Sequence, residues 1–121
     1  MARHNDVGKW GEDVAADYLQ QQGFSIIERN WKVGRLEVDI IAIGPNLVLF
    51  VEVKTRRNDN FGSPYESVDW RKQKNLLAAM RQYMAIKFIQ SPMRYDIISI
   101  VGCAESYELE HIENAVSNFI Y

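Results

Sequence analysis

Two apolar segments joined by a short turn constrain the fold of this sequence more than any other feature. They span residues 36–43 and 47–55, and Gly44-Pro45-Asn46 connects them. A connection this short, made of turn-forming residues, predicts an antiparallel β-hairpin. Because side chains alternate between the two faces of a strand, the two strands can pair in only two parities.

One of these parities buries a continuous apolar face and gathers the charges on the other. The buried face holds Leu36, Val38, Ile40 and Ala42 from one strand and Leu47, Leu49, Val51 and Val53 from the next. The opposite face is apolar at one end, with Ile41, Ile43, Val48 and Phe50, and charged at the other, with Glu37, Asp39, Glu52 and Lys54. The second parity would bury unpaired charges, which costs several kcal/mol. We therefore predict the first, with a helix over the apolar half and the charges at an open edge.

The charged end of the hairpin has the composition of a metal site. Carboxylates held this close repel one another unless Lys54 or a cation neutralises them. Oxygen ligands suit Mg²⁺ or Mn²⁺, with water and substrate completing the coordination. The alternative is that Glu52 and Lys54 form an ordinary solvated ion pair where the strand emerges into water. The pattern alone leaves both readings open.

The remaining pattern predicts an α/β fold, a central mixed β-sheet flanked by helices. We expect a helix over 7–22, capped by Asp6 and ended by Gly23, and a strand over 24–31 closed by Asn30. After the hairpin come a polar loop over 56–67 and a helix over 68–89 with Leu76, Met80, Met84 and Phe88 four residues apart. A strand over 95–101, laid parallel to an earlier strand by the helical crossover, a short strand over 107–112 and a helical tail over 114–121 complete the order.

Size and composition indicate one folded domain spanning residues 1–121. The hydrophobic fraction of 47% and the charged fraction of 25% are ordinary for a globular protein. The single cysteine, Cys103, precludes an intramolecular disulfide, and no apolar run is long enough for a membrane span. We predict a cytoplasmic protein without a membrane partner. The net charge of −2 argues against coating nucleic acid by bulk charge, but it is compatible with a nuclease that has a basic rim.

Basic and aromatic residues alternate between positions 54 and 74. Phe61, Tyr65 and Trp70 are interleaved with the basic side chains, a composition that suits backbone phosphates and exposed bases. A solvated loop followed by a helix start explains the same residues. The nucleic-acid-binding hypothesis assigns contacts to Arg56, Arg57, Lys72, Gln73 and Lys74.

The motif Val38-Asp39, followed by Glu52-Val53-Lys54, resembles the core of the PD-(D/E)xK nucleases, with Val38 at the proline position. The wider chain resembles the small YraN-type bacterial family, itself similar to archaeal Holliday junction resolvases. The matching stretches are Gly8-Lys9-Trp10-Gly11-Glu12, Gly23-Phe24, Asn30-Trp31, Leu36 to Ala42, Leu49 to Arg56, Lys72-Gln73-Lys74 and Arg94-Tyr95-Asp96.

This resemblance implies a restriction-endonuclease-like domain and assigns roles to individual residues. Asp39 and Glu52 would ligate Mg²⁺ or Mn²⁺ with the backbone carbonyl of Val53, and Lys54 would orient or activate the attacking water. Glu12 would complete the site. Without the resemblance, Glu12 is an ordinary glutamate in the first turn of a helix, favourable to the helix dipole. Two active sites would suit a two-strand junction, which implies a homodimer.

Three functions follow as hypotheses. The leading one is a Mg²⁺- or Mn²⁺-dependent endonuclease that hydrolyses phosphodiester bonds in branched or damaged DNA. The second is a non-catalytic nucleic-acid-binding module on the same fold, which predicts binding that survives Glu52→Gln. The third is an interaction protein that uses the sheet edge or the tail.

Overall fold

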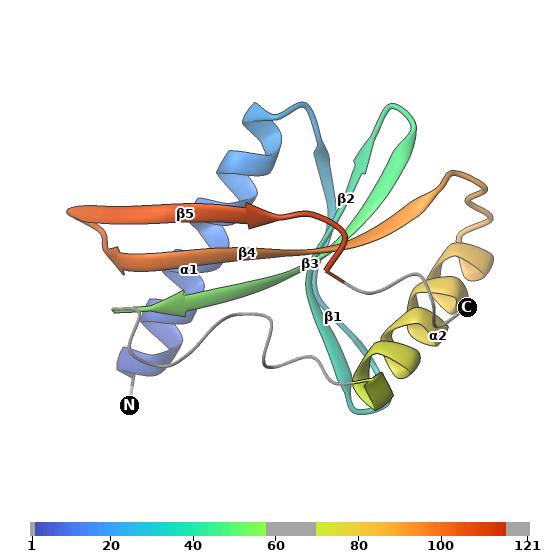
Figure 1. Cartoon of the computed structure of the whole chain (residues 1–121), viewed down its shortest axis with the longest axis horizontal. Coiled ribbons are helices and arrows are strands. Elements are labelled where there is room, and N and C mark those ends of the chain that lie inside the picture. The colour runs from blue at the N-terminus through green and yellow to red at the C-terminus, as the bar shows by residue number, and fades with distance from the viewer. Residues whose placement is uncertain (1, 58–69, 116–121) are drawn as a thin grey trace.

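Two helices lie on opposite faces of a five-stranded mixed sheet in the computed structural model (Figure 1). The structure describes residues 2–57 and 70–115, with the side chains of 8–57, 71 and 73–115. The elements are α1 (Ala2–Gln21), β1 (Ser25–Val33), β2 (Leu36–Gly44), β3 (Leu47–Arg56), α2 (Trp70–Ile86), β4 (Met93–Cys103) and β5 (Ser106–Ile112). The strands lie in sequence order, and all neighbours are antiparallel except β3 and β4, which are parallel as predicted.

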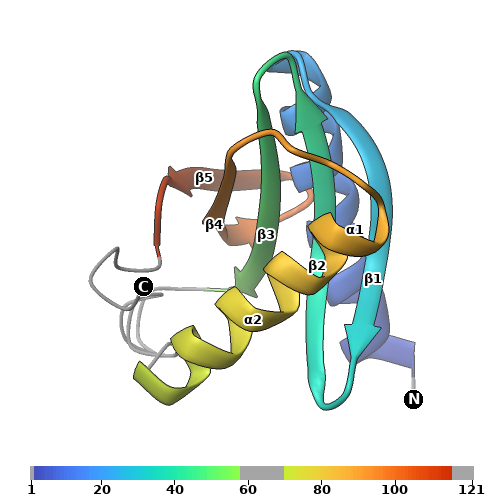
Figure 2. The same ribbon diagram turned by 90° about the vertical axis from the view of Figure 1, so that its right-hand side faces the viewer.

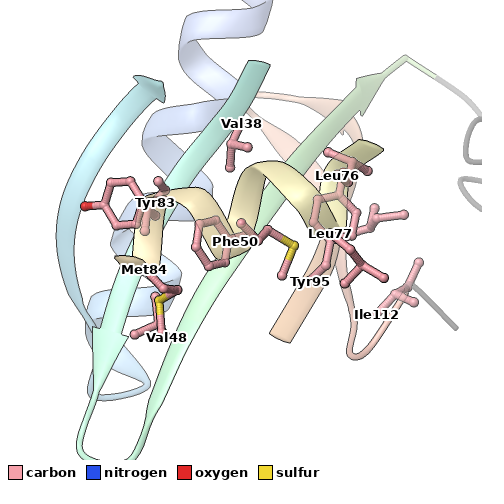
Figure 3. Close-up of a cluster of buried hydrophobic side chains, with 12 residues drawn as sticks. Val38, Val48, Phe50, Leu76, Leu77, Tyr83, Met84, Tyr95 and Ile112 are labelled. Carbon is pink, nitrogen blue, oxygen red and sulfur yellow. The ribbon is translucent and has the colours of Figure 1, made fainter. Parts of the chain in front are cut away.

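The hairpin pairs in the predicted parity. Ile41 lies opposite Phe50 and Ala42 opposite Leu49, and the pairing runs from the turn to Ile40 and Val51. The α2 helix crosses the face that carries Phe50, as expected (Figure 2). Figure 3 shows Tyr83 and Met84 of α2 directed onto the strands, where the Tyr83 ring meets Phe50 edge to face with ring centroids 5.7 Å apart.

One part of the parity prediction is wrong. Leu36 and Val38 were expected on the face of Ile40 and Ala42, but both pack into the cluster beneath α2. Ile40 and Ala42 instead pack against α1, together with Ala15, Ala16 and Leu19. Strict alternation of side chains therefore fails between Val38 and Ile40, at the point where β2 loses its pairing with β3 and keeps its pairing with β1.

Several element ends also differ from the prediction. The α1 helix begins at Ala2, so Asp6 lies inside it and is not its cap, because the apolar periodicity that marks the helix starts only at Val7. Asn30 does not close β1, which continues to Val33. Phe88 was expected on the core face of α2 but is 91% exposed, because the helix ends at Ile86 and Phe88 has a left-handed backbone with φ 56°.

Parts of the predicted loop over 56–67 and of the helical tail over 114–121 lie outside the described residues. In the portion of the chain that the structure covers, no helix is long and apolar enough to cross a membrane.

Candidate functional site

A fork opens in the sheet where β2 and β3 part. Their pairing stops at Ile40 and Val51. The preceding part of β2 continues its ladder with β1, while the following part of β3 continues with β4 (Figure 1). Asp39 and Glu52 are the next residues on the two diverging strands, so they stand on opposite sides of the opening.

The side chain of Asp39 bridges this opening. The backbone N–H of Val53 donates a hydrogen bond of 2.8 Å to Oδ2 of Asp39. The carboxylate on β2 thus binds the backbone of β3 just beyond the last paired residues. This contact orients Asp39 toward the strand that carries Glu52 and Lys54.

Asp39 is also in an unfavourable electrostatic environment for a carboxylate. Burial raises its pKa to about 6, and the negative charges of Glu12, Glu52 and Glu37 add to that rise against the hydrogen bond from Val53. The structure therefore brings the predicted carboxylates near one another. A bound cation would relieve their repulsion.

Glu52 is held by two neighbours. Nζ of Lys54 lies 2.8 Å from Oε2 of Glu52, and the hydroxyl of Tyr95 donates a hydrogen bond to Oε1. Burial, followed by the charge of Glu52, raises the pKa of the Tyr95 hydroxyl. Tyr95 lies on β4 and was not predicted as a site residue. Its apolar neighbours indicate only a core position, and the contact spans 43 residues of sequence.

Glu12 reaches the fork because α1 approaches β3 very closely at Gly11. A Cβ atom built on Gly11 would lie 2.0 Å from Oγ1 of Thr55, so only glycine fits. The next residue, Glu12, is 19% exposed in its side chain and lies 3.5 Å from Arg29. The Asn30 amide, turned with its nitrogen toward Glu12, donates to Oε2 at 3.2 Å. Glu12 is therefore tied to the end of β1 rather than left at the surface.

The donors at the fork fit a hard divalent cation with few protein ligands. Within the described parts of the chain, no three histidine, cysteine or carboxylate side chains stand close enough together to hold a metal ion. Mg²⁺ is commonly held by one or two carboxylates, with water and substrate phosphate in the other positions. Asp39 and Glu52, which follow the last paired residues on the two strands of the fork, match that pattern.

The predicted nucleic-acid contacts do not form a single patch. Arg56 is half-buried at the end of β3, and Arg57 follows it at the surface. Lys72, Gln73 and Lys74 lie in the first turns of α2. Figure 1 draws the end of β3 at the far left and the start of α2 at the lower right, so the two groups lie apart.

A second polar network lies on the α1 side of the sheet and ties β4, β5 and α1 together. Asp96 is fully buried and accepts two hydrogen bonds of 2.9 Å from Arg94 and one of 3.0 Å from the backbone of Asn114. His111 Nε2 lies 2.7 Å from Asp96, and Nδ1 lies 2.9 Å from the Tyr18 hydroxyl. Burial acts to raise the pKa of Asp96, but the bonds from His111 and Arg94 outweigh it and lower the pKa.

This network was not predicted, because no spacing in the sequence links His111 to Asp96 or to Tyr18. Since an ionised carboxylate only accepts hydrogen bonds, Nε2 of His111 carries a hydrogen, and a neutral ring then accepts from Tyr18 at Nδ1. We interpret this network as a structural clasp.

Comparisons with known proteins agree on one family. The family model described as "Uncharacterised protein family UPF0102" matches residues 11–100. A UPF0102 protein of Flavobacterium psychrophilum is 40% identical over 119 residues, covering 98% of this chain and all of the relative. A UPF0102 protein of Phocaeicola vulgatus is 43% identical over 115 residues, or 95% of each chain. One from Porphyromonas gingivalis is 41% identical over 117 residues, covering 95% of this chain and 87% of the relative.

Proposed function

This chain belongs to the UPF0102 family, and we propose that it is a metal-dependent nuclease with a restriction-endonuclease-like fold that hydrolyses phosphodiester bonds of DNA. The order of one helix, a three-stranded meander, a helical crossover and a strand parallel to β3 supports that fold. Branched or damaged DNA is the substrate class that the resemblance to junction resolvases favours.

The fork in the sheet is the observation that carries this proposal. It sets Asp39 and Glu52 across one opening from two strands, with Lys54 beside Glu52 and Glu12 nearby from α1. A solvated ion pair at a strand end would explain only the contact between Lys54 and Glu52. It does not explain a half-buried Asp39 that turns toward the same opening and whose pKa is raised by burial and by the charges of three other carboxylates.

Each side chain has a distinct role in the proposed reaction. Asp39 and Glu52, with the backbone carbonyl of Val53, would hold Mg²⁺ or Mn²⁺, which supplies charge to polarise the phosphate and acidify water. The ammonium of Lys54 would orient the attacking water and offset charge on the phosphate. Glu12 would add negative charge behind Asp39 and so strengthen the attraction for a cation.

A non-catalytic nucleic-acid-binding module is the second candidate. One observation favours it: the ion pair with Lys54 and the hydrogen bond from Tyr95 engage both carboxylate oxygens of Glu52. If this arrangement persists in the presence of Mg²⁺, the fork is a structural ion pair. Any nucleic-acid binding would then depend on basic side chains elsewhere.

One experiment separates the two candidates. The purified protein is incubated with single-stranded, duplex, flapped and four-way DNA in Mg²⁺ or Mn²⁺, beside Asp39→Asn and the surface control Asp17→Asn. We expect cleavage by the wild type and Asp17→Asn but not by Asp39→Asn. Binding without cleavage in all three proteins would support the non-catalytic module. Equal cleavage by wild type and Asp39→Asn would place the chemistry elsewhere.

Metal binding is tested independently of cleavage. Titration calorimetry with Mn²⁺ should detect a site in the wild type that is lost in Asp39→Asn and Glu52→Gln. Equal Mn²⁺ affinity in all three proteins would contradict the proposed ligands. Light scattering on the same samples tests the homodimer that the resemblance implies.

A further inference from the structure

All the charged residues of the α2 helix are basic, in a protein whose net charge is −2. It contains two arginines near its start and middle and two lysines, and no acidic residue between Trp70 and Ile86. The acidic residues are concentrated elsewhere, notably on and around β5, where Glu105, Glu108, Glu110 and Glu113 lie within nine residues.

The exposed face of α2 concentrates this charge along one stripe. Arg71, Lys74, Ala78 and Arg81 are all exposed and recur every three or four residues, the spacing of one helical face. The opposite face packs on the sheet through Leu76, Met80 and Tyr83. The stripe therefore points outward from Arg71 to Arg81, over about the first three turns of the helix.

A groove runs beside this stripe, between α2 and the turn that joins β1 to β2. It has a volume of about 340 Å³. Its lining comes from the turn on one side, including Arg35, and from Asn75, Ala78 and Gln82 of α2 on the other. Figure 2 shows α2 crossing in front of β2, with the β1–β2 turn below it. One guanidinium and two carboxamides thus line the groove together with the apolar residues Val33, Leu36, Ala78 and Ala79.

We infer that this groove binds the sugar–phosphate backbone of a nucleic-acid strand. Arg35 in the lining and Arg81, which precedes the lining residue Gln82 on α2, would neutralise neighbouring phosphates. The amides of Asn75 and Gln82 would donate to phosphate or sugar oxygens. Ala78 leaves room for the backbone to approach the helix. Cations and amide donors without carboxylates on the helix match a phosphodiester chain better than they match a protein surface, which carries both charges.

The groove is connected to the fork through β2. Leu36 lines the groove and Asp39 lies three residues further along the same strand. A strand bound in the groove would therefore be led toward the proposed metal ligands. This inference rests on the proposed function for its substrate, but it concerns binding and not the chemical step.

Binding is measured by fluorescence anisotropy with a labelled 30-base-pair duplex in EDTA, which prevents cleavage. The test protein is the double variant Arg35→Ala/Arg81→Ala. The control, Lys9→Ala/Lys32→Ala, removes the same number of positive charges from α1 and β1. Lys32 precedes the groove-lining Val33 on β1, so the side chain of Lys32 points to the opposite face of the strand. Loss of two phosphate contacts should reduce the slope of log K against log salt by about 1.8 and weaken binding on the order of 50-fold at 0.1 M salt.

Equal loss of duplex affinity in the test and control variants would overturn the inference that the groove binds DNA. The proposed function would still hold if the protein cleaves DNA and Asp39→Asn does not. The absence of duplex binding by the wild type would overturn the groove inference, whereas the proposed function is decided separately by the cleavage panel in Mg²⁺ or Mn²⁺. A groove-specific loss in a protein that cleaves nothing would support the inference for a non-catalytic module.

A second measurement does not depend on removing charge. In a Cys103→Ser background, Ala78→Cys places a thiol in the groove and Asp17→Cys places one on the exposed side of α1. The duplex should slow maleimide labelling at Ala78→Cys several-fold and leave Asp17→Cys unchanged. Equal labelling rates with and without DNA at both positions would refute the inference.

Discussion

Replacing Asp39 by asparagine should stabilise the metal-free protein at pH 8, although it removes a proposed metal ligand. Burial raises the pKa of this carboxylate to about 6, and the negative charges of Glu12, Glu52 and Glu37 add to that rise. An asparagine oxygen can still accept the hydrogen bond from the N–H of Val53. The substitution therefore removes the repulsion and keeps the contact that bridges the fork.

The magnitude follows from the difference between the folded and unfolded pKa values. Each pKa unit corresponds to about 1.4 kcal/mol, so the rise from 3.8 to about 6 sets an upper value of about 3 kcal/mol. Solvent screening of a half-buried group reduces this to about 1–2 kcal/mol. Because the folded protein binds this proton more tightly, the stabilising contribution is present below pH 4 and is lost as the pH rises to about 6.

The assay is urea unfolding in EDTA between pH 4 and pH 8, with Asp17→Asn as the control for removing an exposed α1 carboxylate. We expect the stability difference between Asp39→Asn and wild type to grow between pH 4 and 6 and then to level off. Addition of Mn²⁺ at 100 times its Kd should stabilise the wild type by about 2.7 kcal/mol and leave Asp39→Asn unchanged. An Asp39→Asn protein that is less stable than wild type at pH 8, with no pH-dependent difference, would refute the reasoning.

Three further substitutions test individual contacts. Tyr95→Phe removes the hydroxyl that orients Glu52 and should weaken Mn²⁺ binding about 10-fold in calorimetry; unchanged affinity would show that the hydroxyl has no part in positioning the ligand. Asp96→Asn leaves buried donors without an anion and should lower the free energy of unfolding by about 3 kcal/mol or more in urea, and a loss under 1 kcal/mol would contradict the clasp. Gly11→Ala should destabilise the protein because its Cβ meets Thr55, and Thr55→Ala should restore most of that loss in a double-mutant cycle; additive effects would contradict the close approach of α1.

The central hairpin was predictable because its register depends on a local rule. Side-chain alternation and the cost of burying charge select one pairing, and the structure has that pairing between Ile41 and Phe50. The same rule placed Asp39, Glu52 and Lys54 on the charged end and a helix over the apolar end. These conclusions needed only the short turn and the order of apolar and charged residues.

Other contacts depend on distant parts of the chain that no local pattern relates. Tyr95 reaches Glu52 across 43 residues, and Tyr18 reaches His111 across 93. The sequence around both tyrosines indicates ordinary core positions, because no neighbouring residue pattern predicts a polar partner for the hydroxyl. The groove between Arg35 and Gln82 also requires the crossing of α2 over the β1–β2 turn, which follows from the tertiary packing alone.

The place where alternation fails is also the place where the candidate site forms, and one cause accounts for both. At Ile40 the strand β2 gives up its pairing with β3 and keeps β1 alone, which moves Val38 to the α2 side of the sheet. A continuous ladder would cover this position with the neighbouring strand. Once the strands part, the carboxylate of Asp39 can bind the backbone of β3 at Val53, next to Glu52 in the sequence. A sheet that obeyed alternation throughout would be easier to predict from sequence, but it would have no opening in which two strands could present ligands to a single cation.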